Sequence, residues 1–310
     1  MTTREHQTLL AEATELQRML ENTPEDFAID RLSLEARIEE VQAELHGKQS
    51  ASREPAHSVL TFSGRPVLRS HGILADFGAK AVNQFTDAVA MLAASLRGPL
   101  RAAGPIPDRE SNRILITNIA TGSFGFELEE DLSQSELATD EPSAIEQAFE
   151  SLRELLESTV GTDDDLTEKL ADVDARVVRT LQEYLGGLAD AEALCAFEFR
   201  DQAFRFRDVG QVRRSAARLS EDNVHEEERT LAGQFEGAVP HHRRFEFQRS
   251  DTGDLVYGKV DPGVEDADRI NDIRHRPVEI RVLARWVGEG RPRYTLLELP
   301  DVTPDASASG

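Results

Sequence analysis

The stretch RILITNIATGSFGFELE, residues 113–129, decides how we interpret the fold. Its first part, ILITNIA at 114–120, is an almost continuous apolar run, which is typical of a strand buried on both faces. After Gly122 the segment SFGFEL alternates, so it predicts a second strand with Phe124, Phe126 and Leu128 on one side. We therefore expect two strands joined at a glycine-containing turn, with the rest of the chain arranged to cover them.

Apolar stripes at helical spacing lie on both sides of this hairpin in the sequence. Apolar residues recur every three or four positions in 73–96, 142–160 and 163–188, and each segment predicts one amphipathic helix. The segment 194–207 alternates like a second hairpin, and a short helix is expected at about 209–219. We interpret 57–222 as an acidic α+β body.

The N-terminal segment predicts a helical hairpin with very little core. Residues 5–46 carry two apolar stripes, including Leu34, Ile38 and Val41 at coiled-coil spacing, and the polar segment 47–56 reads as a linker. Isolated helices of this length are marginal in water, so the hairpin at 1–47 needs a partner surface. That surface is either a second copy, which would make the protein a homo-oligomer through 5–46, or the body of the same chain.

The C-terminal part predicts a small β-barrel. Strand patterns fall at 229–239, 243–249, 254–260, 277–287 and 293–299, and a longer polar connection follows the third strand. Five short strands with this insertion favour an OB-type barrel, and an SH3-like barrel fits nearly as well. The fold class is therefore α+β, with the barrel at 226–300 and a disordered tail at 301–310.

Composition limits the classes of function. The net charge is −23, and residues 127–192 contain 20 acidic but only 4 basic residues, so this segment disfavours nucleic acid and favours solubility or a basic partner. No apolar run is long enough for a membrane span, and the N-terminus lacks a signal-peptide layout. A single cysteine fits a reducing compartment, so we expect a cytoplasmic protein. The 31 arginines against 4 lysines are typical of a GC-rich bacterial genome.

No motif specifies a reaction, a cofactor or a metal. The segment TGSFG approaches a nucleophile elbow, but a strand follows Ser123 where the elbow needs a helix. Gly122, Ser123 and Gly125 are a candidate backbone nest for an anion, and a tight turn is the structural alternative. The acids at 163–165 fit a helix start better than a metal site. We expect no cofactor, no metal and no catalytic residues.

Two basic patches are candidate partner-binding sites. Six arginines lie between 200 and 218 among four phenylalanines, an arrangement that suits a nucleic-acid platform or a packed hairpin with solvated charges. Four adjacent basic residues follow Pro240 at the turn between the first two barrel strands. The candidate residues are Arg213, Arg214, Arg218, His241, His242, Arg243 and Arg244.

The sequence thus predicts a non-catalytic, cytoplasmic interaction or assembly protein whose barrel binds a protein partner. An alternative is a nucleic-acid-binding accessory protein of bacterial defence or repair, using 200–218 and the barrel. A third is a hydrolase with an unfamiliar site. These alternatives stay open at the level of sequence, because fold alone does not give function.

Overall fold

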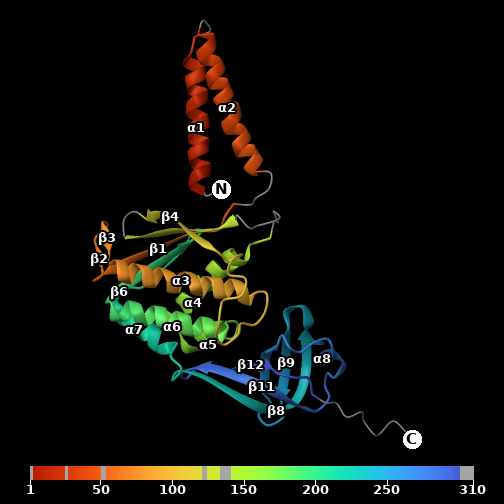
Figure 1. Cartoon of the computed structure of the whole chain (residues 1–310). Helices are drawn as coiled ribbons and strands as arrows, with labels where there is room; N and C mark the ends of the chain where they lie inside the picture. Colours follow the sequence, from red (N-terminus) through yellow and green to blue (C-terminus); the bar gives the residue numbers. More distant parts are fainter. Residues whose placement is uncertain (1–2, 25–26, 50–53, 121–123, 133–140, 301–310) are drawn as a thin grey trace. The chain divides into compact units, whose positions relative to one another are not determined.

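The computed structural model describes residues 3–24, 27–49, 54–120, 124–132 and 141–300 (Figure 1). The chain divides into two compact units, the first formed by residues 1–96, 105–153 and 190–207 and the second by 97–104, 154–189 and 208–310. Helices, an open sheet and a closed barrel confirm the α+β class. The domain boundaries predicted from sequence stay a prediction. No helix in the described ranges is both long and apolar enough to cross a membrane.

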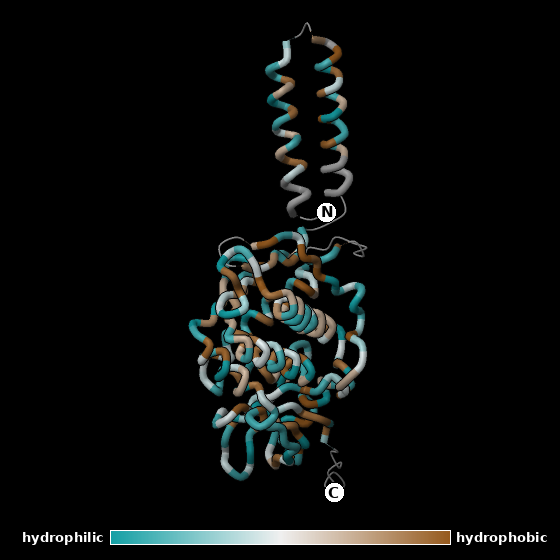
Figure 2. Tube along the Cα trace, turned by 60° about the vertical axis from the view of Figure 1, so that its left-hand side comes forward, coloured by the Kyte–Doolittle hydropathy of each residue, from teal (hydrophilic) through white to brown (hydrophobic). Residues whose placement is uncertain are grey.

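The N-terminal hairpin consists of α1 (Thr3–Asn22) and α2 (Ala28–Gln49), as predicted. Hydrophobic and hydrophilic residues alternate along both helices (Figure 2). Among the described side chains of the two helices only Ile38 and Val41 are buried, so the hairpin has the small core expected of it. Arg31, which interrupts the apolar stripe, donates hydrogen bonds to the backbone oxygens of Leu20 and Thr23 and so satisfies the end of α1.

The first unit contains an open antiparallel sheet of five strands in the order β4-β5-β1-β6-β7. The strands are β1 (His57–Gly64), β4 (Ile114–Ala120), β5 (Phe124–Glu130), β6 (Ala193–Phe199) and β7 (Gln202–Arg205). Both predicted hairpins, β4–β5 and β6–β7, are confirmed.

The prediction that 114–120 is buried on both faces is wrong. β4 lies at the edge of the sheet, with Ile116 56% and Ile119 53% exposed, and β1 occupies the centre. An apolar run does not distinguish a central strand from an edge strand, because both can carry the same residues.

Helix α3 (Ala75–Ser95) and the first part of α4 (Ala144–Val160) cover one face of this sheet. Phe62 of β1 packs edge-on against Phe77 of α3, with ring centroids 5.6 Å apart. Phe197 of β6 contacts both Phe85 of α3 and Phe149 of α4. The short strands β2 (Val67–Leu68) and β3 (Gly72–Ile73) form a separate two-stranded ribbon before α3. The aromatic residues therefore hold the two helices on the sheet.

The predicted helix 163–188 is two helices, α5 (Asp163–Leu170) and α6 (Ala175–Asp190). The continuous apolar stripe hides the break, which occurs where Asp174 starts a new helix. Its carboxylate accepts a hydrogen bond from the backbone N–H of Arg176, as an N-terminal helix cap does. As a result of this break, Asp172 lies in the connection between the two helices.

The second unit contains the barrel, preceded by α7 (Val209–Arg218). The barrel strands are β8 (Val224–Val239), β9 (Arg244–Arg249), β10 (Leu255–Val260), β11 (Val278–Val287) and β12 (Arg293–Leu296). A 3₁₀ turn, η2 (Pro240–His242), follows β8, and the one-turn helix α8 (Arg269–Asp272) lies in the polar connection after β10.

The strand order closes the barrel as β10-β12-β11-β8-β9, with β9 returning to β10. The third and fifth strands, β10 and β12, pair in parallel, and all other neighbours are antiparallel. This parallel pair and the insertion after the third strand identify the OB-type arrangement of the two that were predicted.

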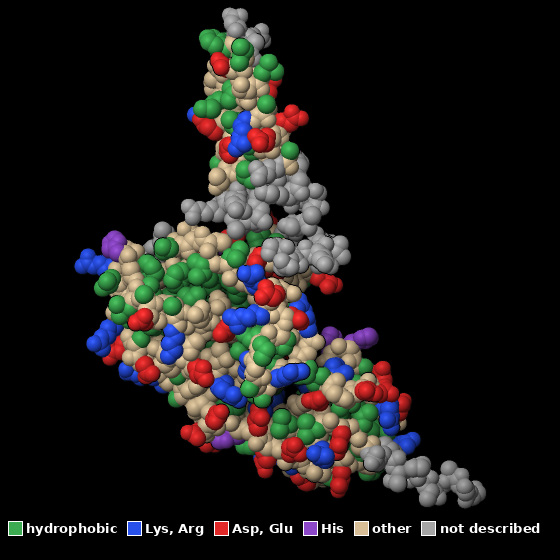
Figure 3. Space-filling model, in the orientation of Figure 1, with side chains coloured by type: hydrophobic (Ala, Val, Ile, Leu, Met, Phe, Trp, Pro, Cys, Tyr) green, Lys and Arg blue, Asp and Glu red, His purple; other side chains and the backbone are tan. Residues whose placement is uncertain are grey.

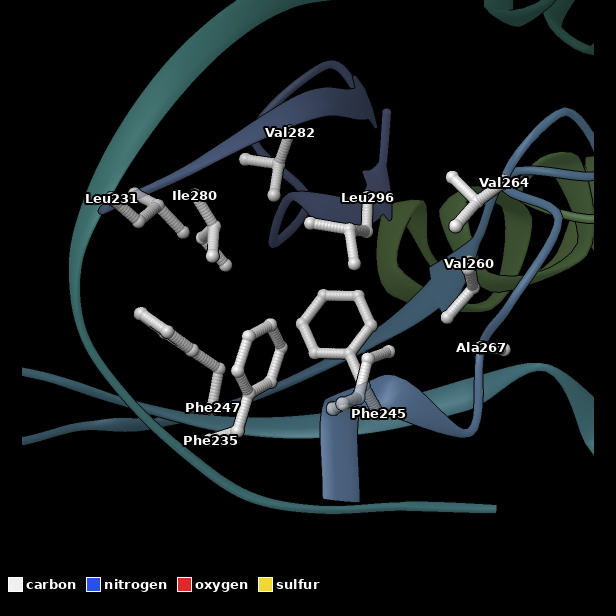
Figure 4. Close-up of a cluster of buried hydrophobic side chains, with 11 residues drawn as sticks. Leu231, Phe235, Phe245, Phe247, Val260, Val264, Ala267, Ile280, Val282 and Leu296 are labelled. Carbon is white, nitrogen blue, oxygen red and sulfur yellow. The ribbon is translucent and has the colours of Figure 1, made fainter. Parts of the chain in front are cut away.

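The barrel is filled by side chains from all five strands and from the connection after β10 (Figure 4). Phe235 is fully buried and contacts the rings of Phe245 and Phe247 edge-on. Gly233 pairs with both β11 and β9, at the point where β8 passes from one neighbour to the other. A Cβ there would lie 2.0 Å from the carbonyl oxygen of Gln248, so the close approach of the strands requires glycine.

Candidate binding cleft

An open cleft with a volume of about 990 Å³ lies within the second unit. One wall is the outer face of the barrel, formed by the end of β8 and by β9, β10 and β12. The other wall is the segment 157–172, which contains the end of α4 and α5. The lining combines carboxylates, cations and tyrosines.

The barrel wall follows from strand alternation. In β10, Val256 and Val260 point into the core, so Tyr257 and Lys259 point outward. In β9 the outward residues that line the cleft are Arg244 and Glu246, which alternate with buried phenylalanines. The register places Arg244 opposite Lys259 and Glu246 opposite Tyr257. The cleft therefore contains a cross-strand pair of two cations next to a pair of a carboxylate and a phenol.

The helical wall begins with a capping box. The Thr162 hydroxyl accepts a hydrogen bond from the backbone N–H of Asp165, and the Asp165 carboxylate accepts one from the backbone N–H of Thr162. The hydrogen bonds from the Thr162 hydroxyl and backbone lower the pKa of Asp165 below its ordinary value of 3.8. This cap fixes where α5 begins and therefore where its side chains enter the cleft.

The other two acids at the start of α5 hold the turn between β11 and β12. Asp163 accepts a hydrogen bond from the backbone N–H of Glu289, and Asp164 accepts one of 2.7 Å from that of Arg291. These contacts account for carboxylates that superficially resemble a metal site. Among the residues that the structure describes, no group of three or more His, Cys, Asp or Glu side chains is placed to hold a metal ion.

Further contacts fasten α5 to β11. The backbone N–H of Val287 donates to the Thr167 hydroxyl at 3.0 Å, and the guanidinium of Arg285 donates to the carbonyl oxygens of Leu170 and Val173. Backbone groups at the end of a helix lack intrahelical partners, so Arg285 satisfies the last turn of α5. The helical wall is thereby held to the barrel through backbone as well as side-chain contacts.

Two ion pairs link the walls of the cleft. Glu168 accepts a hydrogen bond of 2.9 Å from Arg293, and Asp172 pairs with Lys259. Burial lowers the pKa of the Lys259 ammonium from its ordinary value of 10.5, while the contact with Asp172 favours the charged form. These four charges are used within the chain itself.

Other polar groups of the cleft are available to a ligand. Arg244 and Glu246 are exposed, and neither forms an ion pair within the described part of the chain. Tyr257 is 55% exposed, so most of its ring is accessible to a ligand. A cation, a carboxylate and an aromatic ring on adjacent strands can together bind a ligand that has an anionic, a cationic and an apolar group.

The structure separates the basic residues predicted at the β8–β9 turn. His241 and His242 are exposed in η2, and Arg244 lines the cleft. Arg243 has a left-handed backbone (φ 47°), and its guanidinium donates to the carbonyl oxygens of Val260, Asp261 and Val264. Arg243 thus fastens the turn to the chain after β10. Whether these residues bind a partner stays a prediction.

The arginines predicted in the other patch also differ in their surroundings. Arg213 and Arg214 are exposed on α7. Arg218 is half-buried, forms a 2.7 Å ion pair with Asp163 and donates to the carbonyl oxygens of Thr159 and Gly161. It therefore connects the end of α4 to the start of α5, while Arg213 and Arg214 remain candidates for partner binding.

The predicted anion nest falls mainly outside the described residues, since these exclude Gly122 and Ser123. Gly125 lies in β5 opposite Thr61 of β1. A Cβ on Gly125 would lie 2.2 Å from the carbonyl oxygen of Leu60. The close approach of the neighbouring strand therefore requires glycine at this position.

Sequence reasoning missed most of the cleft. Tyr257, Lys259 and Tyr294 were not predicted, although the alternation of LVYGKV at 255–260 was a signal that Tyr257 and Lys259 point outward. The helical wall had no such signal, because residues more than 50 positions away from the barrel strands form it. Comparison of the chain with protein-family models, curated proteins and solved structures found no match.

Proposed function

We propose that the protein is an interaction protein and that its barrel binds a partner polypeptide in the cleft of the second unit. The observation that carries this proposal is the lining of the cleft over β9 and β10, where exposed Arg244, Glu246 and Tyr257 lie side by side. Tyrosine and arginine are the residue types that most often dominate the binding energy of protein interfaces. A polypeptide carries positive, negative and apolar side chains close together, and the cleft needs such a combination.

The charge of the cleft favours a polypeptide over nucleic acid. Five carboxylates line it against four cations, and two of those cations already pair with Glu168 and Asp172. Nucleic-acid binding is dominated by contacts of lysine and arginine with phosphates, which the carboxylates would repel. Arg213 and Arg214 on α7 favour the alternative of a nucleic-acid-binding accessory protein, and the experiment below includes that outcome.

The test selects polypeptides that bind the full chain from a displayed library of random peptides. Calorimetry then measures the affinity of the selected peptides for the wild type and for the double variant Arg244→Ala/Tyr257→Ala. We expect the double variant to weaken binding by at least about tenfold, because truncation of the residues that dominate an interface costs about 2 kcal/mol or more, and about 1.4 kcal/mol is a factor of ten.

The matched control is Arg213→Ala/Arg214→Ala, which removes two exposed arginines outside the cleft. The proposal requires this control to bind the selected peptides like the wild type. Single-stranded DNA and RNA are titrated at low and high salt in parallel. Salt-sensitive binding of nucleic acid that is lost in the control variant, together with failure to select any peptide, would refute the proposal in favour of the alternative.

A further inference from the structure

The two edges of the open sheet are built differently. The edge strand β7 has only four residues, and its Arg205 is exposed, 3.9 Å from the carboxylate of Glu198. Short strands and charges protect a sheet edge from pairing with another chain. The opposite edge strand, β4, has seven residues, ILITNIA, without any charge or proline, although 30% of the chain is charged. Within the described residues, β4 pairs on one side only, with β5.

A β-bulge in β4 gathers apolar side chains on one face. Ile116 and Ile119 are three residues apart, so a regular strand would place them on opposite faces. The register shifts between Ile116 and Asn118, and it therefore pairs Ile116 with Leu128 and Ile119 with Phe126, which share one face of β5. Figure 3 shows hydrophobic side chains gathered in this part of the first unit, where Figure 1 labels β4 and α3.

This arrangement gives an open edge beside an exposed apolar cluster. Ile116 and Ile119 are more than half exposed, and Phe124 and Phe126 are only half-buried. We name these four side chains the edge cluster. A ligand for this surface must offer a free strand edge and an apolar face together, because burying only one of the two would leave the other in water.

We propose that β4 is the contact between two copies of this chain, which pair antiparallel through their β4 edges and bring their edge clusters together. A second copy offers the same free edge and the same apolar cluster. A two-fold axis through β4 would therefore pair the two free edges and bring the two apolar clusters into contact. Charge limits where two copies of the chain can meet. Two chains of −23 repel one another wherever acidic surfaces meet, and an uncharged strand is where that repulsion is smallest.

The experiment measures the molar mass of the full chain by light scattering during gel filtration. The wild type is expected at twice the monomer mass of 34.4 kDa, and Ile116→Lys at the monomer mass, because the contact would bury a charged side chain of each copy among apolar residues. Leu68→Lys, at a side chain 66% exposed in β2, is the matched control and should keep the dimer. Far-UV circular dichroism verifies that each variant is folded.

A second variant separates β4 from the hairpin predicted to mediate assembly. Leu32→Lys changes a side chain of α2 that is 65% exposed, and the proposal requires this variant to stay dimeric. Asn118→Cys places a thiol near the two-fold axis and should form a covalent dimer on mild oxidation. The native Cys195 is buried, so it should not form this crosslink itself. A monomeric wild type, or a dimer that Leu32→Lys dissociates and Ile116→Lys does not, would overturn the proposal.

Discussion

The barrel and the open sheet have five strands each but solve the problem of strand edges in different ways. In the barrel every strand has two neighbours, because β9 returns to β10. In the sheet β4 and β7 each lack one neighbour among the described residues. Because side chains fill this barrel and closure removes its strand edges, its outer face and loops are left for binding, whereas an open sheet can also bind through its backbone.

The difference shows in the exposed residues of the two regions. On the barrel, exposed Arg244, Glu246 and Tyr257 point into a cleft of mixed charge. On the sheet, exposed Ile116 and Ile119 lie on an uncharged edge. The two surfaces therefore favour different partners, a polypeptide with charged groups for the cleft and an uncharged strand for the edge.

The largest expected effect comes from a substitution that destabilises the core of one region and leaves the stability of the other unchanged. Phe235→Ala removes the central ring of the barrel and is expected to cost about 3–5 kcal/mol of the free energy of unfolding, as for other buried phenylalanines. Phe197→Ala, equally buried in the sheet, should cost a similar amount. Chemical denaturation is followed by fluorescence of Trp286, the sole tryptophan, which lies in β11, and by circular dichroism.

If each region has its own core, the Trp286 transition moves to lower denaturant in Phe235→Ala and stays in place in Phe197→Ala. The circular dichroism of Phe197→Ala should reveal an earlier transition that the fluorescence does not report. An equal shift of the Trp286 transition in both variants would contradict the separation of the two cores.

A smaller effect on stability tests whether the helix cap fixes the start of α5, which forms one wall of the cleft. Thr162→Ala removes the helix cap and is expected to cost about 1 kcal/mol at neutral pH. The pKa of Asp165 should also rise toward 3.8, because its hydrogen bond from the Thr162 hydroxyl is lost. Denaturation at neutral pH and a carboxylate titration by NMR measure the two quantities.

The pH dependence of this cap has a definite sign. The pKa of Asp165 is lowered in the folded state, so its contribution to stability is present above 3.8 and is lost as the pH falls through the lowered pKa. The gap in stability between the wild type and Thr162→Ala should therefore narrow in acid. Thr86→Ala in α3 is the control, since the Thr86 hydroxyl bonds within its own helix. A gap of constant size down to the lowest pH would argue against the capping box.

Much of the fold was predictable because local patterns specify it. The alternation after Gly122 and at 194–207 gave both sheet hairpins, and the barrel strands followed from their spacing. The pairing of β10 with β12 was not predictable from local patterns, since its paired residues lie 36 positions apart in the sequence. The break before α6 was not predicted, because the apolar stripe continues across it. Asp174 was nevertheless a possible signal, since aspartate often begins a helix.

The candidate site was less predictable than the fold. Of the seven basic residues expected to bind a partner, Arg244 alone lines the cleft, and Arg243 and Arg218 use their guanidinium groups to satisfy backbone carbonyls. A run of basic residues in the sequence shows that the segment is charged but not where each side chain points. In the same way, the apolar run of β4 showed hydrophobicity without showing that the strand lies at an edge.

Hydrogen exchange of the full chain, with and without a peptide selected for binding, tests the central claim most directly, because it locates the partner on the molecule. We expect the bound peptide to slow exchange of backbone amides in β9, β10 and α5, which form the cleft, and to leave β4 and β5 unchanged. Slower exchange confined to β4 and β5, or to α7 with Arg213 and Arg214, would contradict the assignment of the partner to the barrel.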